Sequence, residues 1–285
     1  MKNSLLLHGG VGSESSLSAV LQEYAFKAFD SKSSLNSVVN ATILMEDDPI
    51  FNAGTGSYQR IDGTIQMDAA VMTETGFGSV IGVEKIRNPV KLALDVMQKT
   101  PHLIMAGDGA LRLARMLGYE EYDPNTKKAE DQRRKVMSDL ISSEADKNPR
   151  FTALKRMGDI SKLMQPEDTV GAVACINGTF AAAVSTGGAT PMLRGRVGDS
   201  PIPGAGIYCG PKGAIVATGY GEEIIKHMLC ISVYNDIGSG KLSDILEDKA
   251  SSFEGPIGLI AIDRDGFAHF SSKPMAVGFI SSETG

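Results

Sequence analysis

The sequence predicts an α+β fold in which helices pack on a core of two largely antiparallel β-sheets. Segments with a helical period of apolar residues alternate with short apolar runs typical of buried strands. Two hairpin signals, Asn177-Gly178 and Asp263-Arg264-Asp265-Gly266, each join two such runs, so the flanking strands should pair antiparallel. A doubly wound parallel sheet fits this pattern less well, because its strands are not joined by hairpins.

The first half of the chain opens with a short apolar run, 5–8, that predicts a buried strand leading into the glycine loop Gly9-Gly10-Val11-Gly12. Asn88-Pro89 marks a helix start, because proline is favoured in a first helical turn. The apolar spacing of the remaining segments predicts helices at 16–29 and 34–45, strands at 66–72 and 78–83, and helices at 91–99 and 108–116.

Residues 119–167 differ from the rest of the chain in their dense charge. We expect a helix at 129–142, and we interpret the whole stretch as a mobile connector between two halves of one domain, 1–285. The pattern after the connector predicts helices at 222–234 and 242–249, and strands at 170–176, 179–185, 206–209, 214–218, 257–262, 267–270 and 276–280.

Composition is ordinary for a globular protein: of 285 residues, 42% are hydrophobic and 22% charged. The net charge of −6 argues against a nucleic-acid or anionic-membrane partner. Three cysteines without CxxC spacing do not form a disulfide framework. With no long apolar run and no signal-peptide pattern, we expect a cytoplasmic protein.

Asp168-Thr169-Val170-Gly171 places a hydroxyl at the start of a predicted buried strand. A threonine hydroxyl is a weak nucleophile and needs a base. If the peptide bond before Thr169 is cut, the new α-amine lies on the same residue, and its unperturbed pKa of about 7.7–8 suits a general base. The alternative is that Thr169 only starts a strand, as β-branched residues often do.

Thr186 ends the second arm of the predicted hairpin, so antiparallel pairing should bring it close to Thr169, either to orient the nucleophile or as a structural pair. Arg196 and Asp199 lie in a glycine-flanked loop. They can clamp the carboxylate and the amine of an amino acid, or they can pair with each other at the surface.

Thr218-Gly219 ends a predicted strand and offers a hydroxyl beside a backbone N–H, as an oxyanion hole requires; the glycine can also serve only the turn. The loop after His8 lacks the features of a phosphate-binding motif, and no His, Cys and acidic set has zinc-ligand spacing. We therefore expect catalysis without a cofactor.

Seven short motifs follow one another between Leu5 and about Phe270. They are His8-Gly9-Gly10-Val11-Gly12, Phe51-Asn52-Ala53-Gly54-Thr55-Gly56, Met67-Asp68-Ala69, Asp168-Thr169-Val170-Gly171, Ser185-Thr186-Gly187-Gly188, Gly195-Arg196-Val197-Gly198-Asp199-Ser200-Pro201 and Thr218-Gly219-Tyr220-Gly221-Glu222. In this order they resemble the plant-type asparaginases, or isoaspartyl peptidases, of the N-terminal-nucleophile hydrolases. Each motif alone is weak, but the ordered set spans nearly the whole chain.

The resemblance implies an αββα four-layer sandwich that cuts itself between Asp168 and Thr169 into an α subunit, 1–168, and a β subunit, 169–285. Two such αβ units would form a homodimer. The implied substrates are L-asparagine and β-aspartyl dipeptides, attacked through an acyl-threonine intermediate. The implied roles are nucleophile and base for Thr169, its support for Thr186, the oxyanion hole for Thr218 and Gly219, and substrate binding for Arg196, Asp199, Gly221 and Asn52.

The resembled family also carries a structural sodium, held mainly by main-chain carbonyls in a loop that here spans 45–55. The implied ligand positions are Met45, Glu46, Asp48, Phe51, Ala53 and Thr55.

Three other functions remain open at this point. A glycosylasparaginase-like amidase shares the Asp-Thr and Gly-Arg-Val-Gly-Asp-Ser-Pro elements, but lacks the His-Gly-Gly signature and uses a tryptophan, of which this chain has none. A non-catalytic amino-acid-binding protein would use only Arg196 and Asp199. A glycine-loop phosphate enzyme would need a nucleotide motif that the sequence does not contain.

Overall fold

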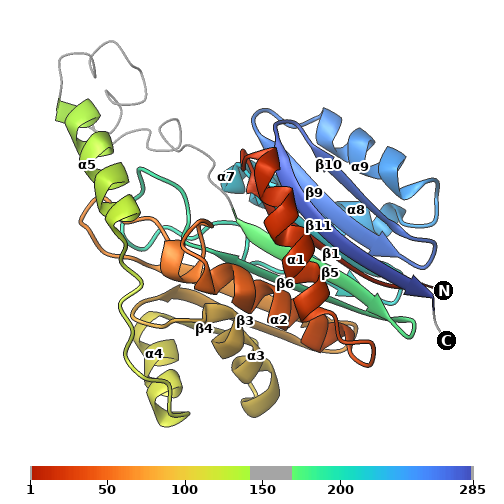
Figure 1. Cartoon of the computed structure of the whole chain (residues 1–285), viewed down its shortest axis with the longest axis horizontal. Helices are drawn as coiled ribbons and strands as arrows, with labels where there is room; N and C mark the ends of the chain where they lie inside the picture. The colour runs from red at the N-terminus through yellow and green to blue at the C-terminus, as the bar shows by residue number, and fades with distance from the viewer. Residues whose placement is uncertain (1, 142–168, 284–285) are drawn as a thin grey trace.

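The computed structural model describes residues 2–141 and 169–283, and its ribbon contains two β-sheets with helices on their outer faces (Figure 1). The seven-stranded sheet has the order β11-β1-β5-β6-β2-β3-β4, and the four-stranded sheet has the order β10-β9-β8-β7. The strands are β1 (Lys2–Val11), β2 (Met67–Thr73), β3 (Phe77–Val83), β4 (Ile104–Ala106), β5 (Val170–Ile176), β6 (Thr179–Thr186), β7 (Ile207–Gly210), β8 (Gly213–Gly219), β9 (Ile257–Asp263), β10 (Phe267–Ser271) and β11 (Met275–Glu283).

The helices between residues 18 and 116 pack on the seven-stranded sheet, and those between residues 221 and 251 pack on the four-stranded sheet. The helices are α1 (Ser18–Ala28), α2 (Ser34–Asp47), α3 (Pro89–Lys99), α4 (Gly107–Met116), α5 (Lys127–Ile141), α7 (Gly221–His227), α8 (Leu229–Asp236) and α9 (Leu242–Ser251). Local sequence explains two starts: Ser33 caps α2 by accepting from the Asn36 N–H, and Pro89 begins α3.

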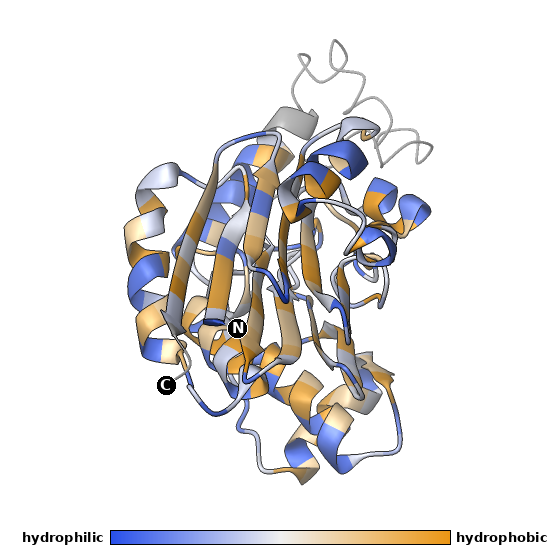
Figure 2. Cartoon of the chain, turned by 90° about the vertical axis from the view of Figure 1, so that its right-hand side faces the viewer, coloured by the Kyte–Doolittle hydropathy of each residue, from blue (hydrophilic) through white to orange (hydrophobic). Residues whose placement is uncertain are grey.

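Both faces of the central strands are buried, which explains their continuous apolar runs. In β5, Ala172 and Ala174 face the α1–α4 side, whereas Val173 and Cys175 face the other sheet. The core between the sheets is completed by side chains of the four-stranded sheet such as Val216. Figure 2 shows the strands apolar along most of their length. Burial of one large apolar side chain contributes about 1.5–3 kcal/mol relative to its exposure.

The expected α+β class is confirmed, and the sheets are antiparallel except for the pair β3–β4, which is parallel. The sequence did not predict β4, because a strand of three residues, Ile104–Ala106, is too short to show alternation of apolar and polar side chains. The first strand is longer than expected, since the segment predicted as a glycine loop continues β1 to Val11. Of the predicted connector, residues 142–168 lie outside the described residues, and α5 falls in the part before them.

The helix predicted at 222–234 is wrong as one element, because it breaks at Met228. This residue adopts a left-handed conformation with φ of 45° between α7 and α8. The reason is tertiary: the N–H groups of Cys230 and Ile231 donate to the carbonyls of Ala205 and Gly204, respectively, instead of to the preceding helical turn.

The hairpin β5–β6 has the predicted two-residue turn at Asn177 and Gly178, which have φ angles of 51° and 76°. Both positive values are those that a type I′ turn requires. The turn sets a register in which Val170 pairs with Ser185. One step further along the ladder, Thr169 therefore lies opposite Thr186.

Candidate active site

The two threonines at the open end of the hairpin form a buried hydroxyl pair. The Thr169 hydroxyl donates to Thr186 Oγ1 over 3.2 Å. Both residues are almost fully buried, at 5% and 3% exposure. The sequence predicted this juxtaposition from the hairpin, and the geometry confirms it. Asp168, the other half of the predicted cleavage site, lies outside the described residues.

The turn that follows Thr186 is held on all sides by hydrogen bonds. The Gly188 N–H donates to Thr186 Oγ1 over 2.9 Å. The Asn52 carbonyl accepts from the Gly187 N–H, and Asn52 Nδ2 donates to the Gly188 carbonyl over 2.5 Å. Asn52 Oδ1 accepts from the Tyr58 N–H. Asn52 was expected to line the site. Both ends of its side-chain amide are bonded to the backbone, and through Gly188 it stabilises the turn after Thr186.

Arg196, Asp199 and Gly221 lie close together. The Cβ that Gly221 lacks would lie 2.8 Å from both Arg196 Nη2 and Asp199 Oδ1, so a side chain there would collide with both. Arg196 and Asp199 do not pair with each other. Arg196 instead makes a bidentate ion pair with Glu222, with distances of 3.0 and 2.9 Å. The sequence had assigned Glu222 only to a helix start.

Asp199 is a buried acid whose second oxygen, Oδ2, has no hydrogen-bond partner within residues 2–141 and 169–283. Burial raises the pKa of Asp199 to about 7, and the negative charges of Glu222 and Asp68 add to the rise. The Arg196 guanidinium opposes it. A bound cation beside Asp199 would satisfy this carboxylate and lower its pKa again.

Thr218 and Gly219 end β8 at the same end of the fold as Thr169. The Cβ that Gly171 lacks would lie 2.8 Å from a methyl of Val216, so the start of β5 faces the end of β8. Thr218 is buried, and its Oγ1 accepts from the Val11 N–H over 3.3 Å. Gly219 has a φ of 140° and passes too close to the Pro256 carbonyl for any side chain.

Two further titratable groups are buried beside the hairpin β5–β6: His8 in β1, which pairs with Gly171, and Glu46 in α2. Burial lowers the pKa of His8 to about 3, so its imidazole is neutral, and Nδ1 accepts from the Gly10 N–H. Burial raises the pKa of Glu46 to about 8, although the Ser185 hydroxyl donates to its Oε1 over 2.6 Å. At neutral pH His8 is therefore neutral and Glu46 is predominantly protonated.

The implied sodium loop joins α2 to the short helical turn Gly54–Gly56. The Glu46 carbonyl lies 2.3 Å from the position of a Cβ on Gly54, and the Phe51 carbonyl lies 1.8 Å from that of a Cβ on Gly56. Within the described part of the chain, no three His, Cys, Asp or Glu side chains are grouped as metal ligands. The oxygens that this loop could offer a cation are therefore main-chain carbonyls, of which those of Asp48 and Ala53 already accept from the N–H groups of Phe51 and Gly56.

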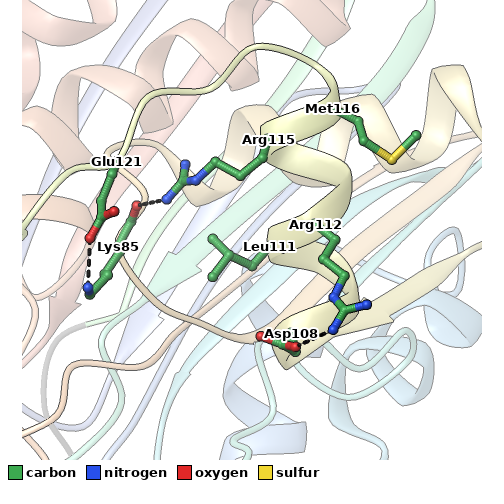
Figure 3. Close-up of a pocket in the computed structure, with 7 residues that line it drawn as sticks. All are labelled: Lys85, Asp108, Leu111, Arg112, Arg115, Met116 and Glu121. Atoms are coloured by element: carbon green, nitrogen blue, oxygen red, sulfur yellow. Dashed lines mark hydrogen bonds and ion pairs between the residues drawn. The ribbon is translucent and has the colours of Figure 1, made fainter.

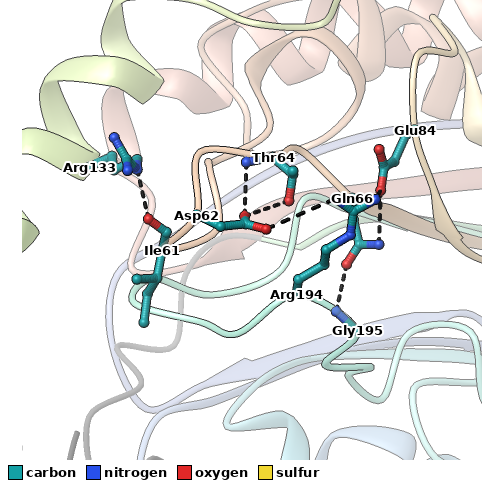
Figure 4. A network of polar contacts seen from close by, with 8 residues as sticks. All are labelled: Ile61, Asp62, Thr64, Gln66, Glu84, Arg133, Arg194 and Gly195. Carbon is teal, nitrogen blue, oxygen red and sulfur yellow. Dashed lines mark hydrogen bonds and ion pairs between the residues drawn. The ribbon is translucent and has the colours of Figure 1, made fainter. Parts of the chain in front are cut away.

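Polar residues that the sequence did not single out hold the Arg196 loop in place (Figure 4). Gln66 Oε1 accepts from the Gly195 N–H over 2.7 Å, and Gln66 Nε2 donates to Glu84. Arg194 pairs with the same Glu84 carboxylate over 2.6 Å. No sequence motif marks these residues, because their partners are distant in the chain.

Arg60 also escaped the sequence analysis. It is only 1% exposed, and its guanidinium donates to the carbonyls of Gly187 and Gln66 over 3.1 and 2.8 Å. Burial lowers the pKa of Arg60 to about 10, so the group stays charged at neutral pH. A lone arginine in a polar loop gives no sequence signal for burial.

A surface pocket of about 550 Å³ lies between α4 and the loops beside it (Figure 3). Its charged side chains are already engaged: Lys85 pairs with Glu121, and Arg112 pairs with Asp108. None of its lining residues belongs to the threonine or arginine clusters. We therefore place the candidate active site at Thr169 and not in this pocket.

Comparison with known proteins gives the family. Residues 7–284 match the model of the asparaginase family. The chain belongs to the asparaginase family. It is 33% identical to a plant-type L-asparaginase of Pyrococcus abyssi, over 97% of this chain and 96% of the relative. It is 35% identical to an isoaspartyl peptidase of Escherichia coli, over 93% and 88%. For an isoaspartyl peptidase/L-asparaginase of Danio rerio the identity is 37%, over 86% and 78%.

The family resemblance expected from the seven motifs is thus confirmed. The asparaginase-family relatives named above are hydrolases, which agrees with a site built on a hydroxyl pair. None of the described helices is long and apolar enough to cross a membrane.

Proposed function

We propose that this asparaginase-family chain is an autoprocessing amidohydrolase that cleaves the side-chain amide of L-asparagine and β-aspartyl dipeptides. The single observation that carries the proposal is the buried Thr169–Thr186 hydroxyl pair. The pair lies at a strand start, and Asp68, which pairs with Thr186 across the sheet, interacts with the charge of Arg196. The names of the relatives support the substrate class.

The first step is the cut that makes the nucleophile. Thr169 Oγ1 attacks the Asp168 carbonyl, and the acyl group moves from the Thr169 nitrogen to its oxygen. Water then hydrolyses this ester, leaving a carboxylate on Asp168 and a free amine on Thr169. The neutral amine can accept the proton of the Thr169 hydroxyl, so no histidine is needed.

The same hydroxyl then attacks the substrate amide. The α-amine of Thr169 takes the hydroxyl proton and returns it to the leaving ammonia or amino acid. Thr218 and the Gly219 N–H stabilise the oxyanion of the tetrahedral intermediate. The bond to the leaving nitrogen breaks, and water releases aspartate from the acyl-threonine.

Substrate binding uses the charges already converging at Gly221. Arg196 offers a planar fork for the α-carboxylate, and it must exchange its Glu222 partner for the substrate. Asp199 accepts from the α-ammonium and ionises as it does so. Glycine at 221 lets Arg196 and Asp199 lie this close to the start of α7, because a Cβ there would be 2.8 Å from both side chains.

We also propose the remaining features that the resemblance implies. The two sheets between helix layers support the αββα fold of N-terminal-nucleophile hydrolases. Exposed apolar side chains at Leu103, Ile104 and Met116, beside the edge strand β4, favour a homodimer of αβ units. When bound, sodium would fix the 45–55 loop through the carbonyls of Met45, Glu46, Asp48, Phe51, Ala53 and Thr55.

The test combines mass and activity. Purified protein is incubated, its intact mass and N-termini are determined, and ammonia release from L-asparagine is measured. We expect a new terminus at Thr169 and activity that rises with the cleaved fraction. Thr169→Ala should abolish both, whereas Thr179→Ala, at the other end of the same hairpin, should abolish neither. Full activity with Met1 as the sole terminus would refute the mechanism.

A further inference from the structure

A fully buried arginine lies against the turn that carries Thr186, and the proposed mechanism does not use it. The Arg60 side chain reaches under the Thr186–Gly188 turn from the loop before β2. The Cβ that Gly188 lacks would lie only 2.4 Å from Arg60 Nη1. Burying a charged guanidinium is unfavourable unless hydrogen bonds to the protein replace those lost from water. The partners of Arg60 therefore indicate what its burial stabilises.

The four polar backbone atoms of Gly187 and Gly188 all have partners. Asn52 takes two of them, the Gly187 N–H and the Gly188 carbonyl. Thr186 Oγ1 accepts from the Gly188 N–H, and Arg60 donates to the Gly187 carbonyl. Arg60 therefore completes the set that fixes this turn, as the counterpart of Asn52.

The Gly187 carbonyl and the Gly188 N–H belong to one peptide unit. A cation bonded to the carbonyl end polarises the unit and strengthens donation from its N–H end. That N–H donates to Thr186 Oγ1, the same oxygen that accepts from the Thr169 hydroxyl. The Arg60 charge is thus connected to the nucleophile through one peptide unit and one hydroxyl.

We propose that Arg60 is a positioning residue for the nucleophile, acting through the Gly187–Gly188 peptide on Thr186. This inference rests on the proposed function. When the Thr169 hydroxyl gives its proton to the α-amine, the Thr186 hydroxyl rotates and donates to the developing negative charge on Thr169 Oγ1. A hydroxyl that accepts a strengthened hydrogen bond is the better donor, so Arg60 favours the attack without touching the substrate.

The test uses Arg60→Met, Arg60→Lys and a matched control, Arg133→Met. Arg133 donates to the carbonyl of Ile61, the residue next to Arg60, and does not contact the Thr186 turn (Figure 4). Activity on L-asparagine is normalised to the fraction of chains with a Thr169 terminus, so that slow maturation is not mistaken for slow turnover. Thermal unfolding confirms that each variant is folded.

For Arg60→Met we expect kcat to fall about tenfold or more, with KM changed less than threefold, since Arg60 stabilises only the attacking state. Arg60→Lys should recover part of kcat, because it keeps the charge but not the fork. The control should retain its kcat. An unchanged kcat in Arg60→Met, or an equal loss in Arg133→Met, would overturn the proposal.

A second readout does not depend on activity. Hydrogen exchange of the Gly188 amide, followed by NMR with ¹⁵N-glycine, should accelerate about tenfold in Arg60→Met and not in Arg133→Met. An unchanged exchange rate would overturn the positioning role. If the wild-type protein releases no ammonia, the proposed function fails, and the Gly188 amide still decides whether Arg60 holds the turn.

Discussion

The pKa of Asp199 leads to a quantitative prediction for ligand binding. With a pKa of about 7 in the free protein, this carboxyl is ionised in roughly one tenth of molecules at pH 6 and nine tenths at pH 8. A ligand whose ammonium requires ionised Asp199 should therefore bind about tenfold more tightly at pH 8 than at pH 6.

L-Aspartate is the suitable ligand, because it is the product of the proposed reaction and does not turn over. We expect its Kd, measured by isothermal titration calorimetry, to fall about tenfold from pH 6 to pH 8. Near pH 7 binding should release about half a proton, detected as a dependence of the heat on the buffer, because half of the carboxyls must ionise.

Two controls separate Asp199 from other titrating groups. Asp199→Asn should bind L-aspartate more weakly and with a Kd that does not change over this range. Succinate, which lacks the ammonium, should bind less tightly as pH rises, because ionised Asp199 repels it. A wild-type Kd constant within a factor of two, or the same slope in Asp199→Asn, would refute the reasoning.

Three more predictions concern the neighbouring groups. The folded-state pKa of Glu46 is raised to about 8, so its contribution to stability is present below its unfolded pKa and is lost as pH rises through 8. Between pH 5 and pH 8, ionisation of Glu46 should lower the free energy of unfolding of the wild type by about 3 kcal/mol. Glu46→Gln should lack this loss, so its free energy of unfolding in urea should depend less on pH. Glu222→Gln frees Arg196 from its ion pair and should lower the Kd for L-aspartate several-fold in calorimetry; weaker binding would contradict this. Gly221→Ala should raise KM for L-asparagine at least tenfold, because its Cβ collides with Arg196, whereas Gly240→Ala, in open space, should leave KM unchanged.

Local sequence predicted those parts of the site that local geometry controls. A two-residue turn at Asn177-Gly178 fixes the register of its hairpin, and that register alone places Thr169 opposite Thr186. Apart from β4, which the sequence missed, the strands were predicted for the same reason. Each strand carries its own pattern of buried residues, independent of what packs beyond it.

Features set by distant contacts could not be predicted. The helical spacing of apolar residues in 222–234 continues across Met228. The helix nevertheless ends there, because the N–H groups of Cys230 and Ile231 donate to the carbonyls of Ala205 and Gly204. The sequence likewise could not show that Arg196 pairs with Glu222, since the Arg196 loop and the start of α7, 26 residues further along the chain, must first approach each other. The burial of Arg60 could not be predicted for the same reason, because its partner Gly187 lies 127 residues further along the chain.

The free site holds its charges in an arrangement that a zwitterion would complete. Arg196 has a partner, Glu222, which is itself 27% exposed and can turn towards solvent. Within the described chain Asp199 Oδ2 has no partner, which is costly for a buried carboxylate. On the proposed function, an amino acid would replace Glu222 at Arg196 with its own carboxylate and would bring its ammonium to Asp199. A ligand without the ammonium would have to displace Glu222 and would leave Asp199 unsatisfied, so the proposed site would discriminate between ligands mainly through Asp199.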